Sequence, residues 1–123
     1  MGYIGEYLGV DIVEKFKLGK VKNIQHSFMK INAEDFNLTK KKFTLIISIS
    51  TLEHIRNDRM VLKKTSPLLT KGGIEIHIVP SGWGLPIYLW HGYRQYSLSR
   101  IESLFDFKDI FVVKLGGMFS FFF

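Results

Sequence analysis

The chain has 123 residues, a length typical of one domain with a modest hydrophobic core. It contains no cysteine, which excludes disulfides, thiol catalysis and thiolate metal sites, and no other metal site is predicted. The formal net charge is +6, with lysine clusters at 15–22, 40–42 and 63–64. Such clusters are compatible with nucleic acid or anionic lipid, but a solvated surface is the commoner reason for them.

No apolar segment approaches the roughly 20 residues that a membrane span needs. The first residues lack the basic-then-apolar pattern of a signal peptide. We therefore expect a cytoplasmic protein without a membrane span, forming a single domain over residues 1–123.

Two extended segments are expected in the first third of the chain. Tyr7–Ile12 (YLGVDI) predicts a strand that places Asp11 at its carboxyl end. A lysine-rich stretch follows, with at most one turn of helix. A second extended segment near Gln25–Ile31 leads into NAED at 32–35. Both segments place polar residues at strand ends, where ligands bind in open α/β sheets.

The stretch KFTLIISISTLEHI, at 42–55, is the strongest strand signal. Its apolar run, from Leu45 to Ile49, is rich in β-branched residues and too short for a helix, so it predicts a strand buried on both faces. Two ionisable residues, Glu53 and His54, follow the strand. Their position at a carboxyl end makes them site candidates.

A helix and two further strands are expected after this point. Asn57 or Asp58 can cap a helix over Arg59–Ser66, which Pro67 limits. The segments beyond it are a turn at 71–73 (KGG), a strand at Ile74–Val79, a glycine- and proline-rich loop (PSGWGLP), an aromatic stretch (YLWHGYRQY), a helix starting at a capping box at Ser99–Glu102, and a final strand at Phe107–Leu115. This succession predicts an α/β layered domain with a mostly parallel sheet.

The pieces GVDI, NAEDF, FTLIISISTLEHI and LLTKGG-IEIHIVPS, from Leu8 to Ser81, resemble the Rossmann-like, class I S-adenosylmethionine-dependent methyltransferases. The resemblance depends on all four pieces in the family's order, since no single piece is specific. The segment PSGWGLP…HGYRQYS is similar, less specifically, to methyltransferases acting on small molecules or surface-glycan precursors. The resemblance implies S-adenosyl-L-methionine as cofactor and methyl transfer to an acceptor of that kind.

Within this resemblance, Asp11 takes the place of the acidic residue that accepts hydrogen bonds from both ribose hydroxyls, a task that suits an acceptor-only carboxylate. Asn32 and Ala33 match the pair that reads the adenine edge, although the family commonly has aspartate in place of Asn32, and Glu34 or Asp35 is an alternative. The wall of the cofactor cleft is matched by Ser50, Thr51 and Leu52. The alternative interpretations are a simple turn aspartate at Asp11 and a simple loop at Asn32.

The catalytic candidates are Glu53 and His54, which would face cofactor or acceptor. If the acceptor is a hydroxyl, His54 can act as general base, because its ordinary pKa lies near neutrality. Alternatively, one of the two caps the following helix or pairs with Arg56. The substrate-binding candidates are His91, Tyr93 and Arg94. This arginine could hold a phosphate or carboxylate, whereas a surface loop pinned by aromatic burial is the alternative.

Two features depart from the family pattern. The family's glycine-rich loop lies roughly twenty residues before the acidic strand end, but ten residues precede Asp11 and MGYIGEYLGV contains no G-x-G. The sequence also ends at MFSFFF, without the family's last strand. We therefore expect an incomplete, truncated Rossmann-like methyltransferase sheet, mostly parallel, lacking the first strand with its glycine-rich loop and the last strand. A protein partner or oligomer would cover the open sheet edge.

Three functions are compatible with these observations. The first, which we predict, is a methyltransferase, active only if something replaces the missing first strand. The second is a non-catalytic remnant or partner-binding module that keeps the sheet but not the cofactor pocket. The third is a basic RNA-binding module, which the lysines favour but which lacks a glycine-rich RNA-recognition signature.

Overall fold

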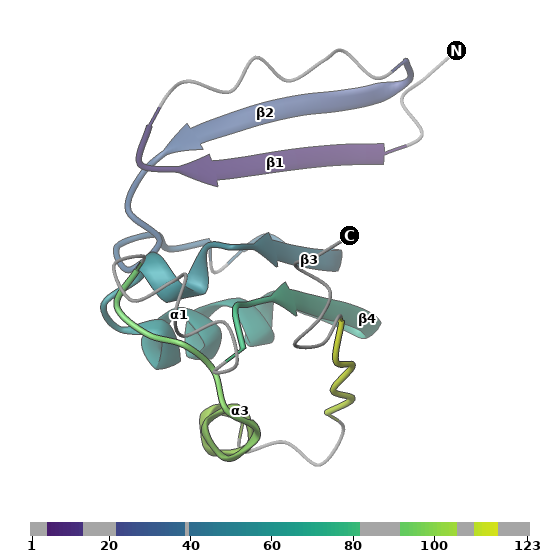
Figure 1. Cartoon of the computed structure of the whole chain (residues 1–123). Helices are drawn as coiled ribbons and strands as arrows, with labels where there is room; N and C mark the ends of the chain where they lie inside the picture. The colour runs from purple at the N-terminus through teal and green to yellow at the C-terminus, as the bar shows by residue number, and fades with distance from the viewer. Residues whose placement is uncertain (1–4, 14–21, 39, 82–91, 106–109, 116–123) are drawn as a thin grey trace. The chain divides into compact units, whose positions relative to one another are not determined.

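The structure is a computed structural model that describes residues 5–13, 22–38, 40–81, 92–105 and 110–115 (Figure 1). The chain divides into two units, Met1–Leu38 and Thr39–Phe123, and each contains a two-stranded parallel sheet. The single domain over 1–123 stays a prediction. No helix in the described ranges is long and apolar enough to cross a membrane.

The first unit contains strands β1 (Gly5–Asp11) and β2 (Ile24–Lys30). They pair in parallel from Gly5 opposite Ile24 to Asp11 opposite Lys30. Asn23 enters β2 with a φ of 68°, a left-handed conformation in which asparagine is enriched. The two predicted strands are thus confirmed to within two residues at each end.

The second unit is built on a βαβ arrangement. Strand β3 (Phe43–Ile49) is followed by the short 3-10 helix η1 (Leu52–His54), helix α1 (Asp58–Thr65), the 3-10 helix η2 (Ser66–Leu68) and strand β4 (Leu69–Ile78). Asn57 caps α1, because its side chain accepts a hydrogen bond of 3.1 Å from Met60 N. The helix ends before Pro67, as predicted.

The four strands pair two by two, as β1–β2 and β3–β4. A classic doubly wound sheet has the order 3-2-1-4-5-6, and without its first strand it retains the pairs 2–3 and 4–5. The observed pairs correspond to these. The fold is therefore α/β and mostly parallel, an incomplete Rossmann-like fold as the sequence predicts.

The predicted turn at Lys71-Gly72-Gly73 is wrong, because these residues lie inside β4. They form an irregularity: the register passes from Phe43 opposite Leu69 directly to Leu45 opposite Ile74. Gly72 has a φ of +76°. A Cβ at Gly73 would lie 3.1 Å from the carbonyl oxygen of Phe43, so the bulge brings two backbones close together.

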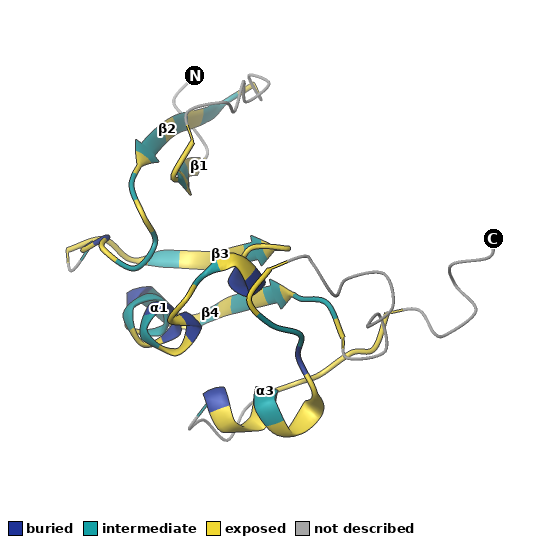
Figure 2. Ribbon diagram, turned by 60° about the vertical axis from the view of Figure 1, so that its left-hand side comes forward, coloured by how far each residue is buried: buried dark blue, intermediate teal, exposed yellow. Residues whose placement is uncertain are grey.

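Burial differs from the prediction for the central strand. Leu45, Ile47 and Ile49 are 48%, 53% and 60% exposed, so β3 is not buried on both faces. Exposed and partly buried residues alternate along β3 and β4 (Figure 2). The buried apolar residues of this unit come mainly from the helices and loops: Leu52, Val61, Leu62, Leu68, Tyr96 and Leu104.

The last described elements also differ from expectation. Helix α3 spans Leu98–Leu104 and is capped by Ser97, which accepts from Arg100 N at 3.2 Å. The predicted capping box at Ser99 is thus two residues too late. Residues 110–115 form no strand, so the predicted final strand is wrong there, and 107–109 lie outside the described residues. Residues 82–91, which include most of the PSGWGLP loop and the start of the aromatic stretch, also lie outside the described residues.

Candidate functional site

Asp11 and the Asn32 turn lie at the same carboxyl edge of the β1–β2 sheet. Asp11 ends β1, and its carbonyl oxygen accepts a hydrogen bond of 2.9 Å from Ile31 N, one residue before Asn32. Oδ1 of Asp11 accepts from Val13 N at 3.0 Å. Among the described residues, Oδ2 of Asp11 has no such contact, so it is free to accept another donor.

Asn32 organises a tight turn after β2. Its side-chain Oδ1 accepts from Glu34 N at 2.9 Å, and its carbonyl oxygen accepts from Asp35 N and Phe36 N at 2.9 and 3.2 Å. The side chain of Asn32 therefore shapes the loop, which agrees with the alternative interpretation of Asn32 as part of a simple loop. Within the described residues they leave the N–H of Ala33 unused.

The second unit places Ser50, Thr51 and Leu52 at the carboxyl end of β3. Ser50 has a φ of +45°, which is uncommon for a residue other than glycine, and its N–H donates to Ile78 O at 2.9 Å. Thr51 Oγ1 donates to Ile49 O at 2.9 Å. Leu52 is 3% exposed, so its side chain belongs to the core, and only its backbone can line a cleft.

Glu53 lies against a segment that is about 40 residues later in the chain. Tyr93 N donates a hydrogen bond of 2.6 Å to Glu53 O. Gly92 has a φ of +79°, and a Cβ there would lie 2.9 Å from Glu53 O and 3.1 Å from Glu53 Cγ. Only glycine permits this approach without strain. The structure therefore brings a predicted substrate-binding residue to a predicted catalytic one.

The carboxylate of Glu53 is buried, and the residue is 2% exposed. Its Oε2 has no hydrogen-bond partner in the described part of the chain, and its Oε1 lies 3.9 Å from Nε2 of His54, whose side chain is 44% exposed. Because Asn57 caps α1, neither Glu53 nor His54 does. The acid and the imidazole are thus adjacent at the strand end, beyond hydrogen-bond distance.

Arg94 is held by the loop between β3 and α1. Its Nη1 and Nη2 donate to Ile55 O and Arg56 O, each at 2.5 Å, and Nη1 lies 3.3 Å from Oδ2 of Asp58. Its guanidinium also lies 5.9 Å from the ring centroid of Tyr93. Arg94 therefore fixes the segment that carries Tyr93, and its side chain is 18% exposed.

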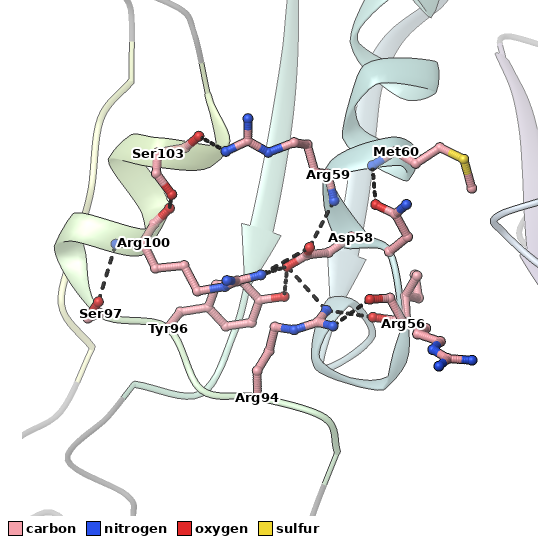
Figure 3. A network of polar contacts seen from close by, with 11 residues as sticks. Arg56, Asp58, Arg59, Met60, Arg94, Tyr96, Ser97, Arg100 and Ser103 are labelled. Carbon is pink, nitrogen blue, oxygen red and sulfur yellow. Dashed lines mark hydrogen bonds and ion pairs between the residues drawn. The ribbon is translucent and has the colours of Figure 1, made fainter.

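Asp58 is the centre of a buried network that joins α1 to α3 (Figure 3). Its carboxylate accepts from the hydroxyl of Tyr96 at 2.8 Å and from Nη2 of Arg100 at 3.1 and 2.8 Å. Arg59 adds a hydrogen bond to the carbonyl oxygen of Ser103. Figure 3 shows the side chains of Arg94, Tyr96 and Arg100 directed at this one carboxylate.

The network changes the acidity of its members. Burial alone raises the pKa of Asp58, but the hydrogen bonds from Arg100 and Tyr96 and the charges of Arg94 and Arg100 outweigh it, so the pKa lies below its ordinary value. Burial, followed by the bond to Asp58, raises the pKa of Tyr96. Asp58 is therefore ionised, and Tyr96 protonated, at neutral pH.

Sequence reasoning missed this network. It considered Asp58 only as a helix cap, Tyr96 only as part of the polar–aromatic segment on the acceptor side, and Arg100 only as part of a capping box. The available signal was an acidic residue in the first turn of a helix and a later run of cationic and phenolic residues, Arg94-x-Tyr96-x3-Arg100. Tyr96 and Arg100 lie 38 and 42 residues after Asp58, so no local sequence pattern predicts that they contact it.

Comparisons with known proteins identify the family. A family model described as a methyltransferase domain matches residues 1–76, more than half of the chain. The chain belongs to the class I methyltransferase family. No curated protein and no solved structure matches it. The matched part of this methyltransferase domain includes β1, β2, β3 and α1, with the strand ends at Asp11, Asn32 and Ser50–His54.

One predicted substrate-binding residue, His91, lies outside the described residues, and its role stays a prediction. In the described ranges, no group of three histidine, aspartate or glutamate side chains could hold a metal ion.

Proposed function

We propose that the chain is an S-adenosylmethionine-dependent methyltransferase that methylates a small-molecule or glycan-precursor acceptor. The observation that carries the proposal is the shared carboxyl edge of β1 and β2, where Asp11 and the Asn32 turn lie together in a chain of the methyltransferase family. Ligands of open α/β folds bind at this edge. A cytoplasmic location stays a prediction.

The nucleoside half of the cofactor fits the residues of this edge. Oδ2 of Asp11 is available to accept from a ribose hydroxyl, and the Ala33 N–H is available to the adenine ring, as far as the described contacts extend. Oδ1 of Asn32 keeps a second lone pair beside its bond to Glu34 N. The role of Ser50, Thr51 and Leu52 as the wall of the cofactor cleft stays a prediction. When bound, the cofactor supplies a methyl group already activated for transfer.

The acceptor would lie near the contact between Glu53 and Tyr93. His54, with a partly exposed imidazole, takes the proton of a hydroxyl acceptor as its oxygen attacks. Oε1 of Glu53 lies 3.9 Å from Nε2 of that imidazole. Tyr93 is 66% exposed and offers a ring face on which a sugar or a planar acceptor can pack. Arg94 keeps this segment in place, and direct contact of Arg94 or His91 with an anionic acceptor stays a prediction.

The second candidate is a non-catalytic methyltransferase-like module. It is favoured by the Asn32 turn, because the side-chain Oδ1 of Asn32 accepts from Glu34 N and so serves the loop itself. The two candidates differ in one measurable property. The first requires that the chain bind the nucleoside cofactor, whereas the second requires no binding.

Calorimetric titration with S-adenosylhomocysteine separates them. We expect micromolar binding by the full chain, loss of binding in Asp11→Ala, and retention in Glu6→Ala, an exposed acid on the same strand. Circular dichroism of both variants checks that they fold. Absence of heat up to millimolar ligand would favour the non-catalytic module. RNA binding that weakens steeply with salt would favour the basic RNA-binding module instead.

A further inference from the structure

The carboxyl group of Glu53 is buried and lacks a hydrogen-bond donor for one of its oxygens. The residue is 2% exposed, and its Oε2 receives no hydrogen bond from any part of the chain that the structure describes. Its Oε1 lies 3.9 Å from Nε2 of His54, which is beyond hydrogen-bond distance. Glutamate is almost never fully buried unless it is paired, and an unsatisfied buried acceptor costs free energy. The absence of a donor at Glu53 therefore requires a reason.

Asp58 and Glu75 show how the same unit pairs its other buried carboxyl groups. Asp58 accepts from a tyrosine hydroxyl at 2.8 Å and from an arginine at 3.1 and 2.8 Å. Glu75 accepts from two hydroxyls at 2.5 and 2.8 Å, and its Oε1 lies 3.0 Å from a histidine nitrogen. Each of these two carboxyl groups thus has both a hydroxyl donor and a nitrogen partner within about 3 Å. By this comparison, Glu53 lacks both.

The arginines of the Asp58 network are not partners of Glu53. Arg94 donates to two backbone carbonyl oxygens of the β3–α1 loop and pairs with Asp58. Arg100 also pairs with Asp58. In the described ranges, no lysine or arginine forms an ion pair with Glu53. A nitrogen donor for its Oε2 is therefore expected from a ligand.

We propose that Oε2 of Glu53 accepts a hydrogen bond from an ammonium group of a bound ligand. This inference deepens the proposed function and rests on it. Glu53 follows the carboxyl end of β3, and ligands of open α/β folds bind outside such ends. An ammonium group is a donor-only cation, so it supplies a hydrogen bond and also stabilises a carboxyl group in its ionised form.

Two ligands of a methyltransferase can carry this group. The methionine half of S-adenosylmethionine has one ammonium group, and an amine acceptor, such as an amino sugar, has another. His54 lies beside the carboxyl group, and its side chain is 44% exposed, which leaves an approach from solvent next to Glu53. The two sources share one chemistry. They differ in which ligand loses affinity when Glu53 is replaced.

Calorimetric titration with two nucleosides tests the cofactor as the source. S-adenosylhomocysteine carries the ammonium group, whereas 5′-methylthioadenosine has the same nucleoside and sulfur without the amino-acid half. If the cofactor is the source, Glu53→Gln should weaken binding of S-adenosylhomocysteine by about tenfold, the loss expected for one charge-assisted hydrogen bond, and leave 5′-methylthioadenosine unchanged. Glu102→Gln makes the same change at an exposed acid on α3 and should alter neither.

Titration with glucosamine and glucose tests an amine acceptor as the source. These sugars differ in one group, which is an ammonium in glucosamine and a hydroxyl in glucose. If the acceptor is the source, the wild-type chain should bind glucosamine more tightly than glucose, and Glu53→Gln should remove the difference. Both nucleosides should then bind Glu53→Gln as they bind the wild-type chain.

The stability of Glu53→Gln without ligand provides a further measurement. Its urea midpoint should fall less than that of Asp58→Asn, because no described donor to Glu53 is lost. An equal or larger fall would show that Glu53 is paired within the chain, and would overturn the proposal. Loss of 5′-methylthioadenosine affinity equal to that of S-adenosylhomocysteine would also overturn it, as would unchanged binding of every ammonium ligand. If the wild-type chain binds neither nucleoside, the proposed function itself fails, which is a different result.

Discussion

The hydroxyl of Tyr96 donates a hydrogen bond of 2.8 Å to Oδ2 of Asp58, a residue 38 positions earlier in the chain. Both residues are almost fully buried, at 4% and 3% exposure. Arg100 and Arg94 complete the environment of the same carboxylate, at 2.8 and 3.3 Å. One side chain at the start of α1 thus holds the segment that precedes α3, and with it the residues that contact Glu53.

Replacing this carboxylate should destabilise the chain. Asp58→Asn removes the charge and leaves two arginines near an uncharged amide, so we expect a loss of about 3 kcal/mol in the free energy of unfolding, measured by urea denaturation. Glu102→Gln is the matched control, because Glu102 is an exposed acid on α3. Its effect should stay within about 0.5 kcal/mol. Equal effects of the two variants would show that the network contributes no stability.

Acid should weaken the fold through two carboxylates. Asp58 has a pKa below its ordinary value for the reasons given above. For Glu75, burial raises the pKa, but bonds from His77, Thr65 and Ser66 outweigh it, so the pKa is again lowered. The folded state therefore binds fewer protons than the unfolded state. The stabilisation is complete above the unfolded values, about 3.9 and 4.3, and is lost as pH falls below them.

Urea midpoints measured between pH 7 and pH 3 test this dependence. The wild-type chain should lose stability progressively below about pH 4.5, where the unfolded carboxylates begin to bind protons. Asp58→Asn should show a shallower decline, because one of the two linked groups is absent. An identical slope in both proteins would contradict the assignment to Asp58.

Gly92 allows the close approach to Glu53, and a methyl group there should disrupt it. Gly92→Ala combines a left-handed backbone with a Cβ 2.9 Å from Glu53 O. Gly72→Ala is its control, since Gly72 has a similar φ of +76° but no atom within 4 Å of the added Cβ. We expect about 1 kcal/mol of destabilisation at Gly72 from backbone strain, and clearly more at Gly92. Equal losses in thermal unfolding would mean that the contact with Glu53 relaxes without cost.

Glu75 should stabilise the contact between β4 and the end of α1. Glu75→Gln replaces a charged acceptor of two hydroxyl bonds with an amide, and we expect a loss of about 1–3 kcal/mol in urea denaturation. Glu6→Gln makes the same chemical change on the exposed side of β1 and should be nearly neutral. If Thr65→Val and Glu75→Gln together cost no more than either alone, the shared hydrogen bond accounts for both effects.

Local patterns were sufficient to locate most elements. The apolar alternation and β-branched runs place β1, β2, β3 and β4, and Asn57 begins α1 where a capping residue is expected, because these signals depend on neighbours only a few residues away. The same patterns place Asp11 and Asn32 at strand ends. They fail at Lys71-Gly72-Gly73, where glycines support a bulge inside β4 rather than a turn between elements.

Tertiary structure decided which residues meet. The apolar run of β3 predicts burial on both faces, but burial depends on which elements cover the sheet, and Leu45, Ile47 and Ile49 are about half exposed. Two contacts join segments that are about 40 residues apart: the network around Asp58, and the contact of Glu53 with Gly92 and Tyr93. Sequence patterns that involve only near neighbours cannot predict such contacts. The amino-acid sequence by itself determined the family, through four motifs in a fixed order, and the strand ends, which follow from short-range patterns. The sequence predicts that Arg94 binds an acceptor. Only the folded chain shows that its guanidinium donates hydrogen bonds to the backbone of the β3–α1 loop and forms an ion pair with the buried Asp58.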